Sequence, residues 1–284
     1  MRRLVLVFGL LASTSGAATG SSAPTSASRT ALGDVGVRLD ERAPLSGAER
    51  RRFAASTAAY ARAGLVDGVL RVIRVDPGDP NHRYGSRPQA FASSGTLRFW
   101  TRTSPDSELP RGSVFADLRG HLFYFAHELG HLVHAAAPAG QPEFEQLHRA
   151  SRAGPYHGRS GNPGDFVSAY AAESVDEDFA ECFSFLTYGR YRWLWGRELK
   201  RVFETRPHLW NKLLHVATMV AAVRGEDDGR WPVLFLEDDE DGDAPALAWV
   251  ELSRDDAGRV NGFRLPPELA PRGGGGCIGC DDGP

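Results

Sequence analysis

The stretch "FYFAHELGHLVHAAA", residues 123–137, places two histidines four positions apart around a glutamate, inside an otherwise apolar run. Residues i and i+4 lie on one face of a helix, so the imidazoles of His127 and His131 can reach one cation. Glu128 then points beside that cation, within reach of a water that it holds. The stretch therefore predicts a zinc site on a helix, with Glu128 as the candidate general base.

The residues around this motif are apolar on nearly all faces of the expected helix, which indicates that the helix is buried. They are Phe123, Tyr124, Phe125, Ala126, Leu129, Leu132 and Val133. Polar side chains in a buried helix need partners, and a catalytic zinc needs a third protein ligand. The extended metzincin pattern fails, because His134 and Ala137 stand where it needs glycine and histidine. We expect His134 at the surface or beside a ligand rather than on the metal.

A glutamate is the better candidate for the third ligand, and "YAAESVDEDFAECFSF", residues 170–185, offers two. On a helix over 175–188, Glu177 and Glu181 share one stripe with Ser184 and Tyr188. One carboxylate could bind the metal while the other accepts the ring N–H of a ligand histidine. Ser174 stands three residues before Glu177, so Glu177 could instead only cap the helix. Spacing alone leaves the choice between the two glutamates open.

H-E-L-G-H followed by S-x-Y-A-x5-E-D-F-A-E resembles the anthrax lethal factor-like metallopeptidases, which include the Pro-Pro endopeptidases. The resemblance covers mainly residues 113–188. It implies that Glu177 is the third zinc ligand and that Glu181 supports the site from behind the ligands. It also implies that Tyr170, seven residues before Glu177, acts on the substrate carbonyl.

Composition and the N-terminal sequence indicate the class of the protein and where it functions. The 284 residues are 42% hydrophobic, as in globular proteins, and the formal charge of −3 gives no electrostatic case for nucleic acid or an anionic membrane. "MRR", the apolar "LVLVFGLLA" and small residues after it predict a signal peptide over 1–18. The apolar run is too short to span a bilayer. We expect a secreted monomer without a membrane anchor that acts on a peptide or protein.

The expected fold is α+β and zincin-like, with two lobes: a small sheet packs on the motif helix, and a mainly helical lower lobe carries Glu177. The segments along the chain are a linker over 19–45, a zinc metallopeptidase domain over 46–225, a small β appendage over 230–266 and a disordered Gly-rich tail over 267–284. Within the domain we expect helices over 46–64, 113–137, 142–151, 175–188 and 208–223, and strands over 68–76 and 95–101. "SSGTLRFWT", 93–101, is the candidate edge strand for binding substrate. Whether Cys277 and Cys280 form a disulfide stays open.

Two functional hypotheses follow. The first is a secreted zinc-dependent endopeptidase in which Glu128 activates a metal-bound water. The second is a binding or effector protein on the same scaffold that no longer turns over. The presence of every catalytic residue type favours the first hypothesis.

Overall fold

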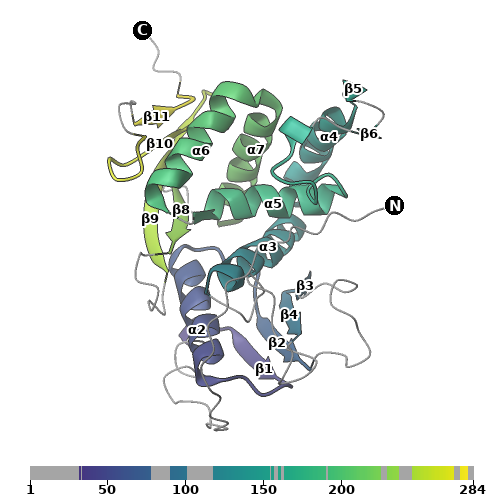
Figure 1. The fold of residues 1–284 in the computed structure, drawn as a ribbon, viewed down its shortest axis with the longest axis vertical. Coiled ribbons are helices and arrows are strands. Elements are labelled where there is room, and N and C mark those ends of the chain that lie inside the picture. Colours follow the sequence, from purple (N-terminus) through teal and green to yellow (C-terminus); the bar gives the residue numbers. More distant parts are fainter. Residues whose placement is uncertain are drawn as a thin grey trace, which may run out of the picture.

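The computed structural model shows an α+β fold in which helix α3, Leu118–Ala136, lies between a small sheet and helix α5, Val175–Thr187 (Figure 1). The structure describes residues 32, 34–77, 90–100, 118–153, 155–156, 159–160, 163–189, 191–224, 229–236, 245–271 and 276–280. The predicted signal peptide and the first part of the expected linker lie outside these ranges. Among the described residues, no helix is both long and apolar enough to cross a membrane.

The N-terminal half is a four-stranded sheet with helix α2, Gly47–Arg62, near one end of α3. Its strands are β1 (Arg38–Glu41), β2 (Val72–Asp76), β3 (Ala90–Ser93) and β4 (Thr96–Trp100), in the order β1-β2-β4-β3. Helix α2 begins as predicted, because Ser46 and Glu49 form a reciprocal capping box. Strand β1 lies within residues 19–45, where we expected a linker. The last part of that segment therefore belongs to the sheet.

The edge of this sheet nearest α3 is β3 and not the predicted segment 93–101. Strand β4 lies inside the sheet, parallel to β2 and antiparallel to β3. Ser94 and Gly95 both have positive φ and form a two-residue turn that folds β3 back along β4. The expectation that 93–101 is the edge strand was wrong, because this tight hairpin places one more strand outside it.

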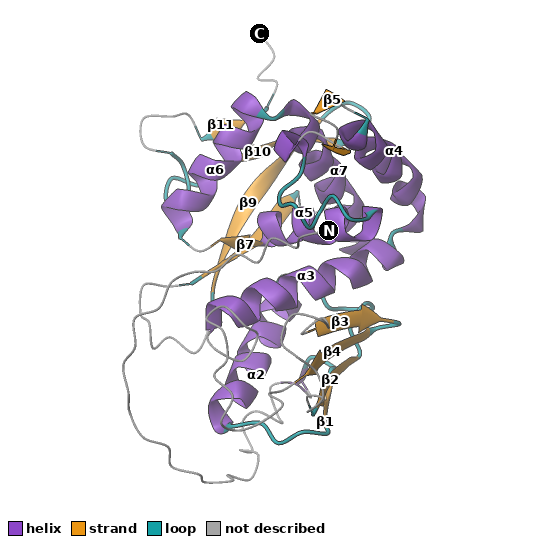
Figure 2. Ribbon diagram, turned by 45° about the vertical axis from the view of Figure 1, so that its right-hand side comes forward, coloured by secondary structure: helices purple, strands orange, loops and turns teal. Residues whose placement is uncertain are grey.

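The helical half surrounds α5 and is shown above α3 in Figure 2. Its helices besides α5 are α4 (Gln141–Arg152), α6 (Arg192–Thr205) and α7 (Pro207–Arg224). Short 3-10 turns lie at Pro138–Gly140 and Pro163–Asp165, and a two-stranded pair joins β5 (Pro155–Tyr156) to β6 (Arg159–Ser160). Helix α5 packs on α3, α4 and α7. The residues after the motif helix therefore bring the acidic stripe of α5 against the histidines.

Strands within 230–235, 246–254 and 260–264 belong to a second sheet that packs on the helices, which differs from the expected small appendage. The sheet order is β11-β10-β9-β8-β7, with β7 (Tyr188–Gly189), β8 (Arg230–Phe235), β9 (Ala246–Arg254), β10 (Val260–Arg264) and β11 (Cys277–Ile278). Strand β7 directly follows α5 and pairs with β8 in parallel. Trp231 is fully buried and its indole N–H donates to the carbonyl of Leu186 at 2.9 Å. These contacts make the sheet part of the same hydrophobic core.

The glycine-rich tail was expected to be disordered from residue 267, and its described part differs from that expectation. Cys277 and Ile278 pair with β10, and Cys277 is joined to Cys280 by a disulfide. Gly262 allows this approach, because a Cβ at that position would lie 2.6 Å from the backbone nitrogen of Cys280. Residues 277 and 278 are therefore part of the second sheet.

Candidate metal centre

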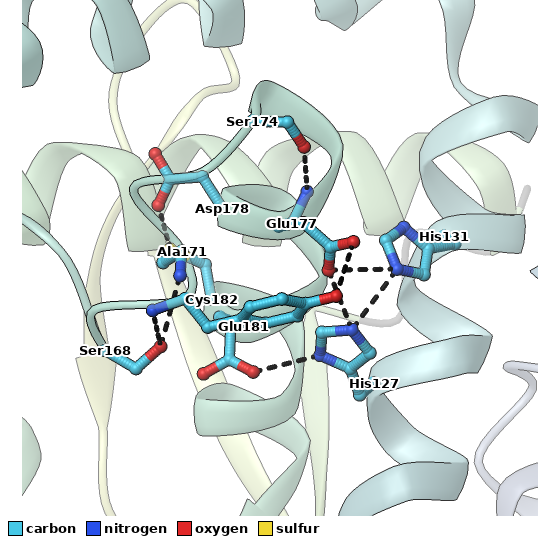
Figure 3. Close-up of polar contacts among 10 residues, drawn as sticks. His127, His131, Ser168, Ala171, Ser174, Glu177, Asp178, Glu181 and Cys182 are labelled. Atoms are coloured by element: carbon cyan, nitrogen blue, oxygen red, sulfur yellow. Dashed lines mark hydrogen bonds and ion pairs between the residues drawn. The ribbon is translucent and has the colours of Figure 1, made fainter. Parts of the chain in front are cut away.

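Three side chains from α3 and α5 converge on one point, as Figure 3 shows. Nε2 of His127 lies 3.2 Å from Nε2 of His131 and 3.0 Å from Oε2 of Glu177. The third separation, between His131 Nε2 and the same carboxylate oxygen, is 3.4 Å. The structure thus brings together the three residues that the sequence suggested as metal ligands.

Glu177 takes part in both the helix cap and the metal site, because its backbone and its side chain have different partners. Its backbone N–H donates to the Ser174 hydroxyl at 3.1 Å, so Ser174 caps α5 as the sequence suggested. Its carboxylate is free of that task and faces the two histidines. Capping by Ser174 fixes the first turn of α5 and so directs the Glu177 side chain toward α3.

Close packing of the two helices sets the distance between the donor atoms. A Cβ on Gly130 would lie 2.9 Å from Cα of Ala180 and 3.2 Å from the ring of Phe183. Since real Cβ atoms do not approach backbone atoms so closely, only glycine lets α3 and α5 touch here. The glycine of the H-E-L-G-H stretch therefore has a packing role between its two histidines.

Glu181 lies one helical turn after Glu177 and contacts the other side of His127. Its Oε1 is 3.0 Å from His127 Nδ1, although the alignment falls short of hydrogen-bond geometry. Burial alone would lower the pKa of His127, but the hydrogen bond with Glu177 and the charge of Glu181 outweigh it and raise the pKa to about 9. With no metal bound, His127 therefore carries a proton at neutral pH.

Glu128 is buried beside these groups, with 7% of its surface exposed. Desolvation raises the pKa of its carboxyl, and the neighbouring His127 and His131 only partly oppose that effect. A carboxylate with a raised pKa is a better proton acceptor than an ordinary surface glutamate. Position and chemistry both suit the predicted role as a base.

Tyr170 reaches the centre from the segment before α5. Its hydroxyl donates to Oε1 of Glu177 at 2.9 Å, and its ring centroid lies 5.8 Å from that of His127. Burial, followed by the hydrogen bond and charge of Glu177, raises the pKa of the phenol. The hydroxyl therefore stays protonated and can donate a hydrogen bond.

The centre lies in a cleft of about 540 Å³ between the edge strand β3 and the start of α5. Phe91 of β3 lines the cleft and is 52% exposed. His134 also lines the cleft; its ring stacks on Phe179 and its Nδ1 lies 3.0 Å from Asp176. His134 is thus buried beside the centre and not among the converging donors. The sequence did not single out Phe91, and its place on an edge strand became visible only once β3 was paired.

The donor set fits zinc. Ligands held tetrahedrally at zinc–nitrogen and zinc–oxygen distances lie roughly 3.3 Å apart, and the three separations here are 3.0, 3.2 and 3.4 Å. Two neutral imidazoles and a carboxylate match the ligand types of catalytic zinc sites. Hydrogen bonds with His127 and His131 outweigh burial and hold the pKa of Glu177 well below its usual range, so its carboxylate is ionised.

Comparison with known proteins adds little to this geometry. No family model matches the chain, and no curated protein matches it. A solved structure from Bacteroides caccae ATCC 43185, named "putative zinc-binding metallo-peptidase", is similar over 72% of this chain and 93% of its own, with 14% identity and a TM-score of 0.43. A likeness of this size establishes neither a shared family nor a shared activity. The resemblance to the lethal factor-like family stays a prediction from the motifs.

Proposed function

We propose that this protein is a zinc-dependent endopeptidase, and the convergence of His127, His131 and Glu177 carries the proposal. Three donor atoms of the types that zinc prefers meet within 3.4 Å of one another. A buried glutamate and a tyrosine hydroxyl lie in the same cleft. This combination suits the addition of water to a carbonyl group more closely than it suits binding alone.

The ion would be held by those three side chains, and when bound it lowers the pKa of a coordinated water toward about 7 and polarises a carbonyl group. Glu128 accepts the proton of the attacking water, because its raised pKa and its burial favour the transfer. Glu128 then passes this proton to the amine that leaves. Glu181 holds the ring of His127 from the other side and stabilises its orientation.

Tyr170 is suited to stabilise negative charge on the carbonyl oxygen. Its phenol stays protonated and already donates to an anionic oxygen, that of Glu177. A donor aimed where charge develops lowers the barrier, because the hydrogen bond strengthens in the transition state. During the reaction the hydroxyl would turn from Glu177 to the carbonyl oxygen.

Strand β3 would bind the substrate backbone. It is an edge strand, it lines the cleft, and an extended peptide can add to such an edge through main-chain hydrogen bonds. The substrate is accordingly a peptide or an extended segment of a protein. This assignment replaces the predicted edge at 93–101.

The decisive variant is Glu128→Gln, which keeps the shape of the side chain but removes the base. We expect unchanged zinc content by elemental analysis and a loss of about 10²- to 10⁴-fold in kcat on peptides selected from a random library. The matched control is Glu145→Gln, since Glu145 is a surface residue that pairs with Arg149. Full turnover by Glu128→Gln would exclude Glu128 as the base. Zinc binding without cleavage of any peptide by the native protein would instead support the binding or effector hypothesis.

We also propose that the protein is exported and that residues 1–18 are removed. The support is the charged, apolar and small-residue order of the N-terminus. The N-terminal sequence of the mature protein, recovered from outside the producing cell, tests this directly. A chain that keeps Met1 and stays in the cytoplasm would refute it.

A further inference from the structure

A second polar cluster lies on another face of α5, buried among α4, α5 and α7. Asp178, next to Glu177, accepts hydrogen bonds from Lys212 Nζ at 2.7 Å and from His148 Nδ1 at 2.8 Å. Lys212 and Asp178 are both fully buried, and His148 is 2% exposed. The mechanism above uses none of these three residues.

The cluster also contacts the segment that carries Tyr170. The ammonium of Lys212 lies 3.9 Å from the ring centroid of Phe166, and the ring of His148 meets the same phenylalanine edge-on at 5.5 Å. Arg206 donates to the backbone carbonyls of Gly164 and Phe166. The start of this segment is therefore fixed by Lys212 of α7, by His148 of α4 and by Arg206, which lies between α6 and α7.

A short, tightly bonded turn connects Phe166 to Tyr170. The hydroxyl of Ser168 accepts from the backbone N–H groups of Tyr170 and Ala171, both at 3.2 Å. Ala171 is fully buried, whereas Tyr170 is 45% exposed. Because packing around so exposed a ring holds it weakly, the position of the phenol depends on where its segment is anchored.

An apolar side chain at 212 would fill the same space without the cost of burying a charge. Lysine adds two directed interactions that an apolar side chain lacks: an ion pair with Asp178 and the attraction of a cation for the Phe166 ring face. Together they join the residue after the ligand Glu177 to the segment that carries Tyr170.

We propose that Lys212 is a positioning residue for Tyr170, acting through Phe166. The structural part of this inference concerns only where the phenol sits. Its catalytic consequence rests on the proposed peptidase function, since displacement of the Tyr170 hydroxyl then lowers kcat.

The test places 3-fluorotyrosine at position 170 alone and compares the native chain with Lys212→Met and Phe166→Leu by ¹⁹F NMR. In the native chain we expect the nearby His127 ring and the Glu177 charge to displace the signal from that of a solvent-exposed fluorotyrosine. We expect both variants to lose most of this displacement while circular dichroism shows a folded protein. The matched control is Lys200→Met, because Lys200 is the only other lysine of the chain and pairs with Glu204 on the surface.

Kinetics supply the second readout. We expect kcat to fall about tenfold in Lys212→Met, as for a misplaced catalytic group, and Lys212→Met to cause no further fall in a Tyr170→Phe background. An additive effect there, or a native ¹⁹F signal in folded Lys212→Met and Phe166→Leu, would overturn the inference. If Lys212→Met does not fold, the ¹⁹F signal of Phe166→Leu decides whether the inference holds. If the native protein cleaves no peptide, the NMR comparison still decides the positioning, and only the proposed function fails.

Discussion

Helix α5 carries acidic side chains on two faces, and the two faces balance their charge in different ways. On the face toward α4 and α7, buried Asp178 is paired with Lys212 from the same chain. On the face toward α3, Glu177 and Glu181 contact imidazoles and the Tyr170 hydroxyl, and no lysine or arginine is found among the described residues that line the cleft. The charges on the first face balance each other, and we call it the complete face. The second face, which we call the metal face, needs a proton on His127 or a cation from outside to balance its carboxylates. A site that lacks its own positive charge is what a metal centre requires.

Removal of the carboxylate on the complete face should have the largest effect on stability. In Asp178→Ala, the ammonium of Lys212 stays buried without its partner, so we expect a loss of about 3–5 kcal/mol in the free energy of unfolding. Urea denaturation of the metal-free protein measures it. The control is Asp176→Ala, two residues away, where the side chain is 73% exposed and pairs with His134. That change should cost less than about 1 kcal/mol. Equal losses in the two variants would contradict the distinction between the faces.

Much of the metal face could be predicted from the sequence, because its chemistry follows local spacing. His127 and His131 are four residues apart, so helical periodicity placed both on one face of a helix. Spacing alone left Glu177 and Glu181 both open as the third ligand, and the choice of Glu177 came from the family resemblance. The complete face was missed because its partners lie far apart in the chain, at 148, 178 and 212. A signal was available, since Lys212 stands in the apolar run "HLWNKLLHVATMV" and a buried lysine needs an acidic partner.

The sheets were harder to predict than the helices for the same reason. Strand β3 has only four residues, and its place at the edge depends on pairing with β4. The second sheet gains its place in the core through the parallel pairing of β7 with β8, which joins Tyr188 to Leu234. Non-local pairing of this kind leaves no periodic pattern, whereas the capping box at the start of α2 is entirely local, and the helix over 46–64 was predicted there.

The contact that joins the metal face of α5 to α3 can be tested at Gly130. In Gly130→Ala, the new methyl group meets the backbone of Ala180, which cannot rotate away, so the helices must separate. We expect a loss of about 1–3 kcal/mol in unfolding free energy and weaker zinc binding, because Glu177 moves away from the histidines. Chelator competition measures the affinity, and Ala136→Ser on an exposed position of α3 is the control. Native affinity in Gly130→Ala would show that the helix spacing does not set the site.

The smallest expected effect concerns protons on the metal face. His127 has a pKa of about 9 in the metal-free protein, above its ordinary value of 6.5. Its proton stabilises the metal-free fold at pH below about 6.5, and this contribution disappears as the pH rises through about 9. Zinc must displace that proton, so we expect affinity to rise by up to about tenfold per pH unit between about pH 7 and about pH 9, then to level off.

Glu181→Gln sharpens this test, because it removes one of the charges that raise the pKa of His127. The variant should bind zinc about 10- to 100-fold more weakly, since its carboxylate no longer orients the imidazole. Its affinity should also level off at a lower pH than in the native protein, because less of its His127 is protonated. Calorimetry in buffers of different ionisation enthalpy counts the released protons directly. Binding without proton release near neutral pH would mean that His127 is already neutral, and the metal face would then lack the protonated imidazole that balances its carboxylates.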